Sequence, residues 1–240
     1  MATLAQAAPL SGAGPRATAI SRKLRAAAMQ GNQSRIKLLL TTLLEHPARR
    51  SDEWLPYQLG VLEEFSMTLH TLAFVDELTG LFNRRGFMRS ATRQLAQLRA
   101  CGQRALLFYA DVDNLKQTND TLGHQAGDAL LRETAAVLRG SFRACDAMGR
   151  LGGDEFAVLA ADQSPEDGAL IIERVAEAVA ACNGARQDAP LSLSVGYVQY
   201  APTDPRPLAE LLRAADSVMY GRKLSKLLVM DPELRCRPTV

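Results

Sequence analysis

The sequence predicts an α+β fold in which hairpins and helical crossovers build one sheet. Strand-like runs alternate with segments of helical period. The expected strands are at 105–111, 147–151, 155–160, 191–199 and near 226–230, and the expected helices are at 84–99, 124–140, 165–182 and 206–222. Gly152 and Gly153 stand between two strand-like runs, which is typical of a tight hairpin. Hairpins mixed with crossovers indicate an α+β sheet rather than a doubly wound one.

Length and composition limit the class of protein. A chain of 240 residues that is 47% hydrophobic can hold one domain of about 160 residues and an appendage. No apolar run approaches the ~20 residues that span a bilayer, and no signal peptide is evident. Four scattered cysteines indicate reduced thiols. We therefore expect a cytoplasmic protein without a transmembrane segment. Basic–aromatic interleaving is lacking, so nucleic acid is not an expected partner.

The first 75 residues are expected to form three parts. Residues 1–16 are rich in Ala, Pro and Gly and are expected to be a disordered tail. Residues 17–50 are expected to be a basic helical segment with a strong amphipathic pattern from Ile36 to Leu44. Residues 51–75 are expected to be a signalling helix with a coiled-coil-like seam. The seam positions are Leu55, Gln58, Leu62, Phe65, Leu69 and Leu72. The alternative is a helix that packs on its own domain.

Charge is unevenly distributed along the chain. Residues 1–50 carry eight Lys or Arg and one acid, a net charge of +7 within a total of +2, so the remainder carries −5. A basic leader can contact an acidic partner, a membrane surface or nucleic acid, although solvated helix faces are the favoured interpretation. The sequence leaves the regulatory partner of these helices unidentified.

Two acidic clusters stand beside glycines and strand ends. Residues 111–113 (Asp-Val-Asp) end an apolar strand, and residues 152–155 (Gly-Gly-Asp-Glu) form the hairpin turn. Magnesium usually binds through one or two carboxylates plus substrate phosphates. The glycines remove side chains where a phosphate chain would approach the backbone. The pattern therefore predicts a site that holds divalent metal against a nucleoside triphosphate.

A set of motifs in one order gives the chain a family resemblance. The motifs are Asp76-Glu-Leu-Thr-Gly-Leu-Phe-Asn-Arg-Arg-Gly-Phe87, the stretch from Asp111 to Asp128, Gly152-Gly-Asp-Glu-Phe156, Leu193-Ser-Val-Gly196 and Ala215-Asp-Ser-Val-Met-Tyr220. With them, residues 76–232 resemble a GGDEF domain, the catalytic domain of diguanylate cyclases. The resemblance implies a palm-like domain with a mostly antiparallel central sheet flanked by helices, followed by a tail at 233–240.

The resemblance also implies a function. A diguanylate cyclase condenses two GTP into cyclic di-GMP and two pyrophosphates, depends on magnesium, acts as a homodimer and is inhibited by its product. Two other classes compete with this interpretation. One is a catalytically weak receptor for GTP or cyclic di-GMP, and the other is a regulatory interaction module built on the basic helices.

Metal and catalytic residues follow from the same resemblance. Asp111, Asp154 and Glu155, with the backbone carbonyl of Val112, would ligate two Mg²⁺ in each active half-site, and Mn²⁺ could replace Mg²⁺. Asp154 and Glu155 would be the catalytic pair, with Asp154 nearest the ribose 3′-hydroxyl. Asp113 alternates to the opposite face of the strand from Asp111. For Asp113, capping of the following helix is therefore an open alternative to a metal-binding role.

Nucleotide-binding residues are implied in the same way. Asn119 and Asp128 correspond to the family's guanine-reading pair, since a carboxylate can accept from the N1–H and the amine of guanine. Lys116 and Lys223 would meet phosphate, and Gly152 and Gly153 would lie along the phosphate chain.

The chain departs from the family pattern after Lys223. The family typically continues through two residues to Gly-Arg-Asn, whereas Lys226 and Leu227 stand here in place of the glycine and the arginine. A lysine supplies charge but not a bidentate fork. The grip on the triphosphate is therefore expected to be weaker or differently arranged.

An Arg-x-x-Asp motif lies upstream of the glycine pair. Arg143 and Asp146 precede Gly152 at the offset of the family's product-inhibition site. There the arginine would grip phosphate and guanine of cyclic di-GMP, and the acid would accept from guanine.

Overall fold

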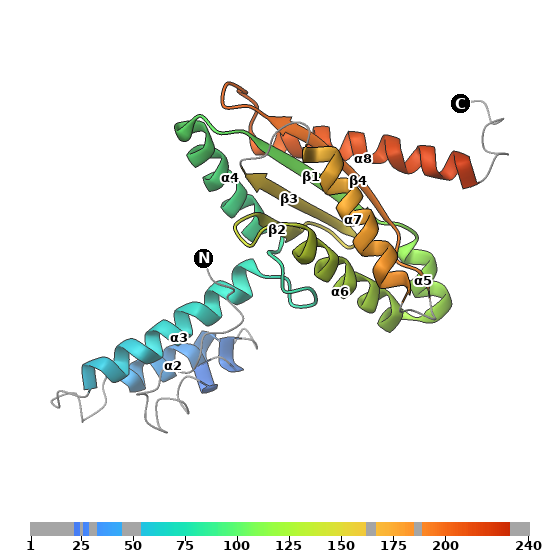
Figure 1. Cartoon of the computed structure of the whole chain (residues 1–240). Helices are drawn as coiled ribbons and strands as arrows, with labels where there is room; N and C mark the ends of the chain where they lie inside the picture. Colours follow the sequence, from blue (N-terminus) through green and yellow to red (C-terminus); the bar gives the residue numbers. More distant parts are fainter. Residues whose placement is uncertain are drawn as a thin grey trace, which may run out of the picture. The chain divides into compact units, whose positions relative to one another are not determined.

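The computed structural model describes residues 22–24, 26–28, 33–44, 54–161, 167–184 and 189–230. These residues belong to two compact units that divide between Val75 and Asp76, and each unit is described by itself (Figure 1). The expected tails at 1–16 and 233–240 lie outside the described residues. No helix in the described part of the chain is long and apolar enough to cross a membrane.

Two helices make up most of the described N-terminal unit. They are α2 (Gln33–Leu44) and α3 (Trp54–Phe74). Val61 and Phe65 of α3 are buried together with Leu24, and Ile36 and Leu39 of α2 pack against this cluster. The amphipathic pattern of α2 therefore places Ile36, Leu39 and Leu40 against the core of the unit, whereas Leu38 is 66% exposed.

The predicted seam of α3 is divided between two environments. Phe65 is 8% exposed in the core of its own unit, whereas Leu62 and Leu69 are 39% and 43% exposed. The side chains of Leu55 and Gln58 lie outside the described part of the helix. Packing on its own unit accounts for Phe65, and it leaves Leu62 and Leu69 on an apolar surface strip.

Four antiparallel strands form the sheet of the C-terminal unit in the order β2-β3-β1-β4. They are β1 (Ala105–Val112), β2 (Ala147–Arg150), β3 (Glu155–Ala161) and β4 (Leu193–Tyr200). β2 and β3 form a hairpin around the glycine pair, as predicted. In the central strand, Asp111 lies opposite Glu155 of β3 and Ser194 of β4. One end of the sheet therefore gathers polar side chains.

Helices cover both faces of this sheet (Figure 1). They are α4 (Arg84–Cys101) and α8 (Leu208–Met230) on one face, and α6 (His124–Ser141) and α7 (Asp167–Gly184) on the other. Side chains alternate along a strand, so Phe108 of β1 packs in the α6/α7 core and Leu107 in the α4/α8 core. The antiparallel sheet between helices confirms the predicted α+β, palm-like class.

Two elements differ from the sequence prediction. Helix α8 runs to Met230, so the expected strand near 226–230 is wrong. No Gly or Pro stands between Arg222 and Met230 to end the helix. The second difference is a separate short helix, α5 (Leu115–Leu122), before α6. It ends at Gly123, whose φ of 86° is accessible to glycine at no steric cost.

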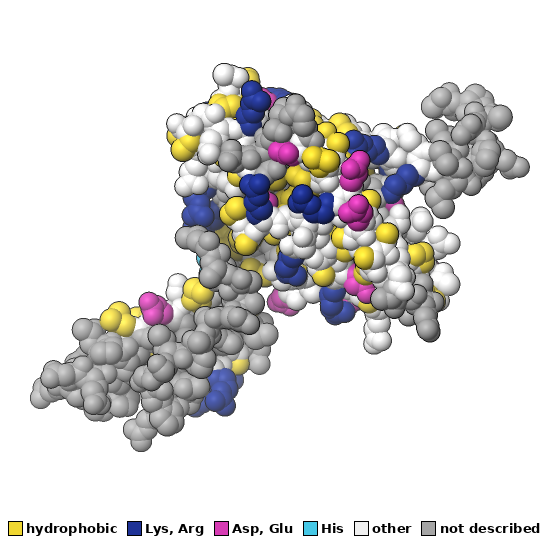
Figure 2. Space-filling model, viewed as in Figure 1, with side chains coloured by type: hydrophobic (Ala, Val, Ile, Leu, Met, Phe, Trp, Pro, Cys, Tyr) yellow, Lys and Arg dark blue, Asp and Glu magenta, His cyan; other side chains and the backbone are white. Residues whose placement is uncertain are grey.

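Charged side chains are interspersed on the visible face of the C-terminal unit. Figure 2 shows Lys and Arg beside Asp and Glu, with apolar side chains between them. Apolar side chains are also exposed in this unit, and Leu170 of α7, for example, is 56% exposed. On the face shown, the charges therefore form no large patch of one sign.

Candidate metal and nucleotide site

The residues predicted to hold metal lie at one end of β1 and β3. Asp111 and Glu155 are partners in the antiparallel register of the two strands. Partners of this kind carry Cβ atoms about 4.5–5.5 Å apart on the same face. The N–H of Val112 donates to the carbonyl of Asp154 at 3.0 Å. The structure therefore brings Asp111, Val112, Asp154 and Glu155 into one corner of the sheet.

Gly152 leaves room for the Glu155 carboxylate. A Cβ added to Gly152 would lie 2.2 Å from Oε2 of Glu155, whereas a Cβ on Gly153 would meet nothing within 4 Å. The two glycines are therefore needed for different reasons. Gly152 accommodates a neighbouring side chain, and Gly153 leaves space that a ligand can approach.

Asp111 is buried and paired with Lys223 of α8, with 2.5 Å between Oδ1 and Nζ. Burial raises the pKa of Asp111 above its usual range, and the hydrogen bond and charge of Lys223 oppose that rise. The nearby charges of Asp154 and Asp113 raise it further, because like charges disfavour ionisation. The ammonium group of Lys223 thus marks a place beside Asp111 where a cation is accommodated.

This donor set fits a divalent metal held jointly with a substrate. Among the described residues, no group of three His, Cys, Asp or Glu could by itself hold a metal ion. Magnesium does not need such a cage, because it keeps several waters and binds through one or two carboxylates plus phosphates. Asp111 and Glu155 supply two such carboxylates on partner strands. The residues present therefore fit Mg²⁺ arriving with a nucleotide.

Tyr109 is a candidate that sequence reasoning missed. It lies two residues before Asp111, on the same face of β1, and its side chain is hydrogen-bonded to Glu155. Burial, and then this hydrogen bond, raise the pKa of Tyr109 above its usual range. The phenol therefore stays protonated and donates to the carboxylate, which orients Glu155. Period-two alternation, counted back from Asp111, is the sequence signal that points to it.

Arg150 is a second residue that the motifs did not single out. Its guanidinium contacts both oxygens of Asp76 at 3.3 Å, and its Nη2 donates to the carbonyl of Gly153 at 2.6 Å. Asp76 also accepts from the N–H and the hydroxyl of Thr79 at 2.9 and 2.6 Å. One side chain therefore ties the first turn of the C-terminal unit to the glycine turn. The sequence carries no signal for a bond across 74 residues.

The predicted guanine-reading residues lie on neighbouring helices. A Cβ on Gly127 would lie 2.0 Å from Oδ1 of Asn119, so the Asn119 amide lies against the turn of α6 that carries Asp128. Asp128 is half-exposed, and its carboxylate lies 3.9 Å from Arg132 one turn further on. Lys116 is exposed on α5, one turn before Asn119 on the same helix face.

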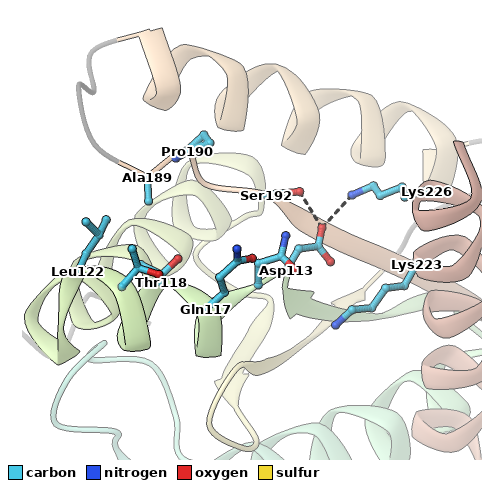
Figure 3. Close-up of a pocket in the computed structure, with 11 residues that line it drawn as sticks. Asp113, Gln117, Thr118, Leu122, Ala189, Pro190, Ser192, Lys223 and Lys226 are labelled. Carbon is cyan, nitrogen blue, oxygen red and sulfur yellow. Dashed lines mark hydrogen bonds and ion pairs between the residues drawn. The ribbon is translucent and has the colours of Figure 1, made fainter. Parts of the chain in front are cut away.

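A cavity of about 390 Å³ lies beside the metal corner (Figure 3). Its walls come from α5, from the segment that leads into β4 and from α8. The lining residues are Asp113, Asn114, Gln117, Thr118, Thr121, Leu122, Ala189, Pro190, Ser192, Lys223 and Lys226. The cavity therefore combines apolar side chains with two lysines and one carboxylate.

Asp113 is held from three directions in this cavity. Its carboxylate accepts from the hydroxyls of Ser192 and Ser194, each at 2.7 Å, and from Nζ of Lys226 at 3.2 Å. Burial alone would raise the pKa of Asp113, but these bonds bring it below the usual range. The alternative role as a helix cap does not hold. Asn114 is the N-cap of α5, in a left-handed conformation with φ 58°, and its side chain makes no capping bond.

Arg143 and Asp146 line a smaller cavity of about 140 Å³ together with Arg174 of α7. Asp146 is 7% exposed, and its oxygens accept the N–H of Arg143 at 2.8 Å and the N–H of Ala161 at 3.3 Å. Burial raises the pKa of Asp146, and these bonds oppose the rise. Asp146 thus fixes the turn that presents Arg143. Sequence reasoning missed Arg174, which donates to the carbonyl of Ser141 at 3.1 Å.

Comparison with known proteins identifies the family. A family model described as "Diguanylate cyclase, GGDEF domain" matches residues 73–226. The chain belongs to the GGDEF family. The resemblance seen in the motifs is thereby confirmed, and it covers the sheet, both cavities and every predicted site residue of the GGDEF domain.

Curated relatives extend beyond this GGDEF chain. Diguanylate cyclase DgcP of Pseudomonas aeruginosa is 32% identical over an alignment of 208 residues, and the match covers 79% of this chain and 31% of the relative. Probable diguanylate cyclase DgcC of Escherichia coli is 34% identical over an alignment of 181 residues, and the match covers 71% of this chain and 46% of the relative. The chain therefore spans less than half the length of these two relatives.

Solved GGDEF structures share the fold. The GGDEF domain of DgcB from Caulobacter crescentus, solved in complex with c-di-GMP, is 27% identical, with a TM-score of 0.59 over 64% of this chain and 91% of that chain. Diguanylate cyclase SiaD, solved in complex with its activator SiaC from Pseudomonas aeruginosa, is 28% identical, with a TM-score of 0.60 over 88% of this chain and 80% of that chain. The second match extends into the N-terminal helices.

Proposed function

We propose that this GGDEF chain is a diguanylate cyclase, which joins two GTP into cyclic di-GMP and releases two pyrophosphates. In each half-reaction the 3′-oxygen of one GTP bonds to the α-phosphorus of the other. The bond from that phosphorus to the bridging α–β oxygen breaks, pyrophosphate leaves, and the hydroxyl proton passes to a nearby base. The partnership of Asp111 and Glu155 across β1 and β3 carries this proposal. The names of the curated relatives support it.

The metal corner has a defined task in this proposal. Asp111, Asp154 and Glu155, with the carbonyl of Val112, would hold two Mg²⁺ per half-site, or Mn²⁺ in their place. Bound metal neutralises the triphosphate and lowers the pKa of the 3′-hydroxyl. Asp154 would lie nearest that hydroxyl. Tyr109 would keep the Glu155 carboxylate oriented through the hydrogen bond that the structure contains.

The nucleotide would lie across α5. Asn119 and Asp128 would read guanine, and a base without the N1–H donor would leave Asp128 partly unpaired, which is a strong source of discrimination. The phosphates would extend along Gly152 and Gly153 towards Lys116 and Lys223. The start of α5 favours them as well, because the first N–H groups of a helix lack intrahelical partners and attract anions.

The reaction requires two copies of the domain. Each domain holds one GTP, and both attacks cross from one nucleotide to the other, so the two sites must face each other in a homodimer. Residues 51–75 would bring the domains together. The exposed Leu62 and Leu69 of α3 supply an apolar strip for this contact.

Product inhibition would act at the smaller cavity. The side chains of Arg143 and Arg174 supply two guanidinium groups in a cavity that also contains Asp146. Guanidinium groups grip phosphate and guanine with paired hydrogen bonds. Since both oxygens of Asp146 already accept backbone N–H groups, its main part would be to hold Arg143 in position.

The N-terminal helices would receive the regulatory signal. The solved structure of SiaD contains an activator protein, and the similarity of this chain to SiaD covers 88% of this chain. We therefore include a protein partner for residues 17–75 in the proposal. The +7 charge of residues 1–50 favours a partner with an acidic surface.

Incubation with GTP and MgCl₂, followed by identification of the products by mass spectrometry, tests the proposed function. Cyclic di-GMP and pyrophosphate in a 1:2 ratio are expected. Binding of GTP or cyclic di-GMP without turnover at every protein concentration would instead identify a receptor.

A further inference from the structure

One edge of the sheet has no neighbouring strand. β4 comes last in the order β2-β3-β1-β4, and no described strand lies on its outer side (Figure 1). At the other edge, the N–H of Phe82 donates to the carbonyl of Met148, and the carbonyl of Phe82 accepts from the N–H of Arg150. The strand expected near 226–230 is part of α8 instead. An edge of this kind offers its backbone groups to another chain.

The register of β1 and β4 shows which backbone groups point outwards. The N–H of Asp113 donates to the carbonyl of Ser192, which continues this register, so the even-numbered residues of β4 direct their groups towards β1. In an antiparallel pair, the alternate residues direct both backbone groups away from the partner strand. The outward-facing residues are therefore Leu193, Val195, Tyr197 and Gln199.

Two cationic side chains of α8 close part of this edge. Nη1 of Arg222 donates to the outward carbonyl of Val195 at 2.9 Å. Nζ of Lys226 donates to the outward carbonyl of Leu193. The Arg222 guanidinium also lies 5.7 Å from the centroid of the Tyr197 ring, a cation–π distance. Tyr197 packs on the α6/α7 side and α8 covers the other face, so Arg222 crosses the edge from one face to the other.

Tight packing of α8 on β4 makes this crossing possible. A Cβ added to Gly196 would lie 2.3 Å from the backbone N of Met219, so the two backbones are in direct contact there. Arg222 follows Met219 by about one turn. Beyond Val195 the edge is uncovered, because no described residue bonds the outward backbone groups of Tyr197 and Gln199. Those groups are available to a further strand.

We propose that the outer edge of β4 is a pairing surface for β4 of a second copy, and that Arg222 keeps this surface closed. The second copy fits because an antiparallel strand, related by a two-fold axis, presents the same set of donors and acceptors in return. Pairing would displace Arg222 from the edge and bring its two copies together, where like charges repel. Charged side chains protect exposed strand edges in this way. The inference does not depend on the proposed function.

Sedimentation velocity of the full chain over a concentration series tests the proposal. Arg222→Ala should raise the association constant between copies about tenfold or more above wild type, since each backbone bond formed across the edge adds a small net stabilisation. Arg213→Ala, which removes another exposed charge from α8, is the matched control and should associate like wild type. Equal association of Arg222→Ala and wild type would overturn the proposal.

Gln199→Pro distinguishes strand pairing from a loosened fold. Proline removes the outward N–H of residue 199 and no bond to β1, so an edge strand tolerates it. The double variant Arg222→Ala/Gln199→Pro should return to wild-type association. If it associates as strongly as Arg222→Ala alone, the added contact does not use the edge and the proposal fails.

Amide hydrogen exchange gives a reading at the edge itself. The amides of Tyr197 and Gln199 should exchange rapidly in wild type, and in Arg222→Ala their exchange should slow as the protein concentration rises. Slow exchange of both amides in dilute wild type would mean that the edge is already covered, which also contradicts the proposal.

Discussion

Gly152→Ala isolates the geometry on which catalysis depends. The added Cβ would lie 2.2 Å from Oε2 of Glu155, whereas ordinary contact begins at 3.4 Å. The carboxylate must therefore move by roughly 1.2 Å, several times the ±0.2 Å within which ligand distances are held. Misplacement on this scale, and loss of one electrostatic contact in the transition state, each cost on the order of 10²-fold or more in rate. The initial rate of cyclic di-GMP formation should fall by about that factor.

The variant should fold normally. Only the far end of a flexible side chain must move, and φ of Gly152 is not positive, so alanine is conformationally acceptable. The melting temperature should therefore stay within about 2–4 °C of the wild-type value. Gly140→Ala is the matched control, because its Cβ would meet nothing within 4 Å on α6, and its rate should be unchanged. A Gly152→Ala rate within threefold of wild type would refute the reasoning.

Four further predictions follow from the same contacts. Tyr109→Phe removes the hydrogen bond that orients Glu155, so kcat should fall about tenfold while the melting temperature changes little; an unchanged kcat would exclude the positioning role. Arg143→Ala should abolish inhibition by added cyclic di-GMP at a similar initial rate, and equal inhibition of both proteins would contradict the site assignment. The folded pKa of Asp113 lies below its usual value of 3.8, so its stabilisation is present above that pH and is lost as the pH falls below it; acid melting curves should show a smaller loss for Asp113→Asn. Deletion of residues 1–74 should lower activity at dilute protein far more than nucleotide binding, and flat, equal specific activity of both chains across a dilution series would remove the dimerising role of α3.

Local patterns were sufficient for most of the fold. The apolar run of β1, the glycine pair of the β2–β3 hairpin and the periods of α4, α6 and α7 are each visible within one element, and the structure contains each of them. The prediction of a strand near 226–230 is wrong because a short apolar run is compatible with either a strand or a helix, and no Gly or Pro after Arg222 ends α8 before Met230. Helix α5 (Leu115–Leu122) is not among the expected helices, because it has eight residues with Leu115 as its buried position and so carries no long apolar period.

The site was predictable where chemistry lies within a motif. Asp111 and Glu155 stand at strand ends, so their partnership across β1 and β3 follows once the strands pair. Contacts between distant segments left no sequence signal. The bond from Arg150 to Asp76 spans 74 residues, and the position of Arg174 in the smaller cavity depends on how α7 packs against α6. Such contacts are set by the packing of whole elements.

The rate of cyclic di-GMP formation by Glu155→Gln tests the central claim most directly. The substitution keeps the shape of the side chain and removes the charge that we propose for metal binding. At saturating GTP and MgCl₂, the account predicts a loss of roughly 10²–10³-fold in kcat, about 3–4 kcal/mol of transition-state stabilisation, with a cooperative thermal transition retained. Turnover within a few-fold of wild type would contradict the assignment of the Asp111–Glu155 corner as the catalytic centre.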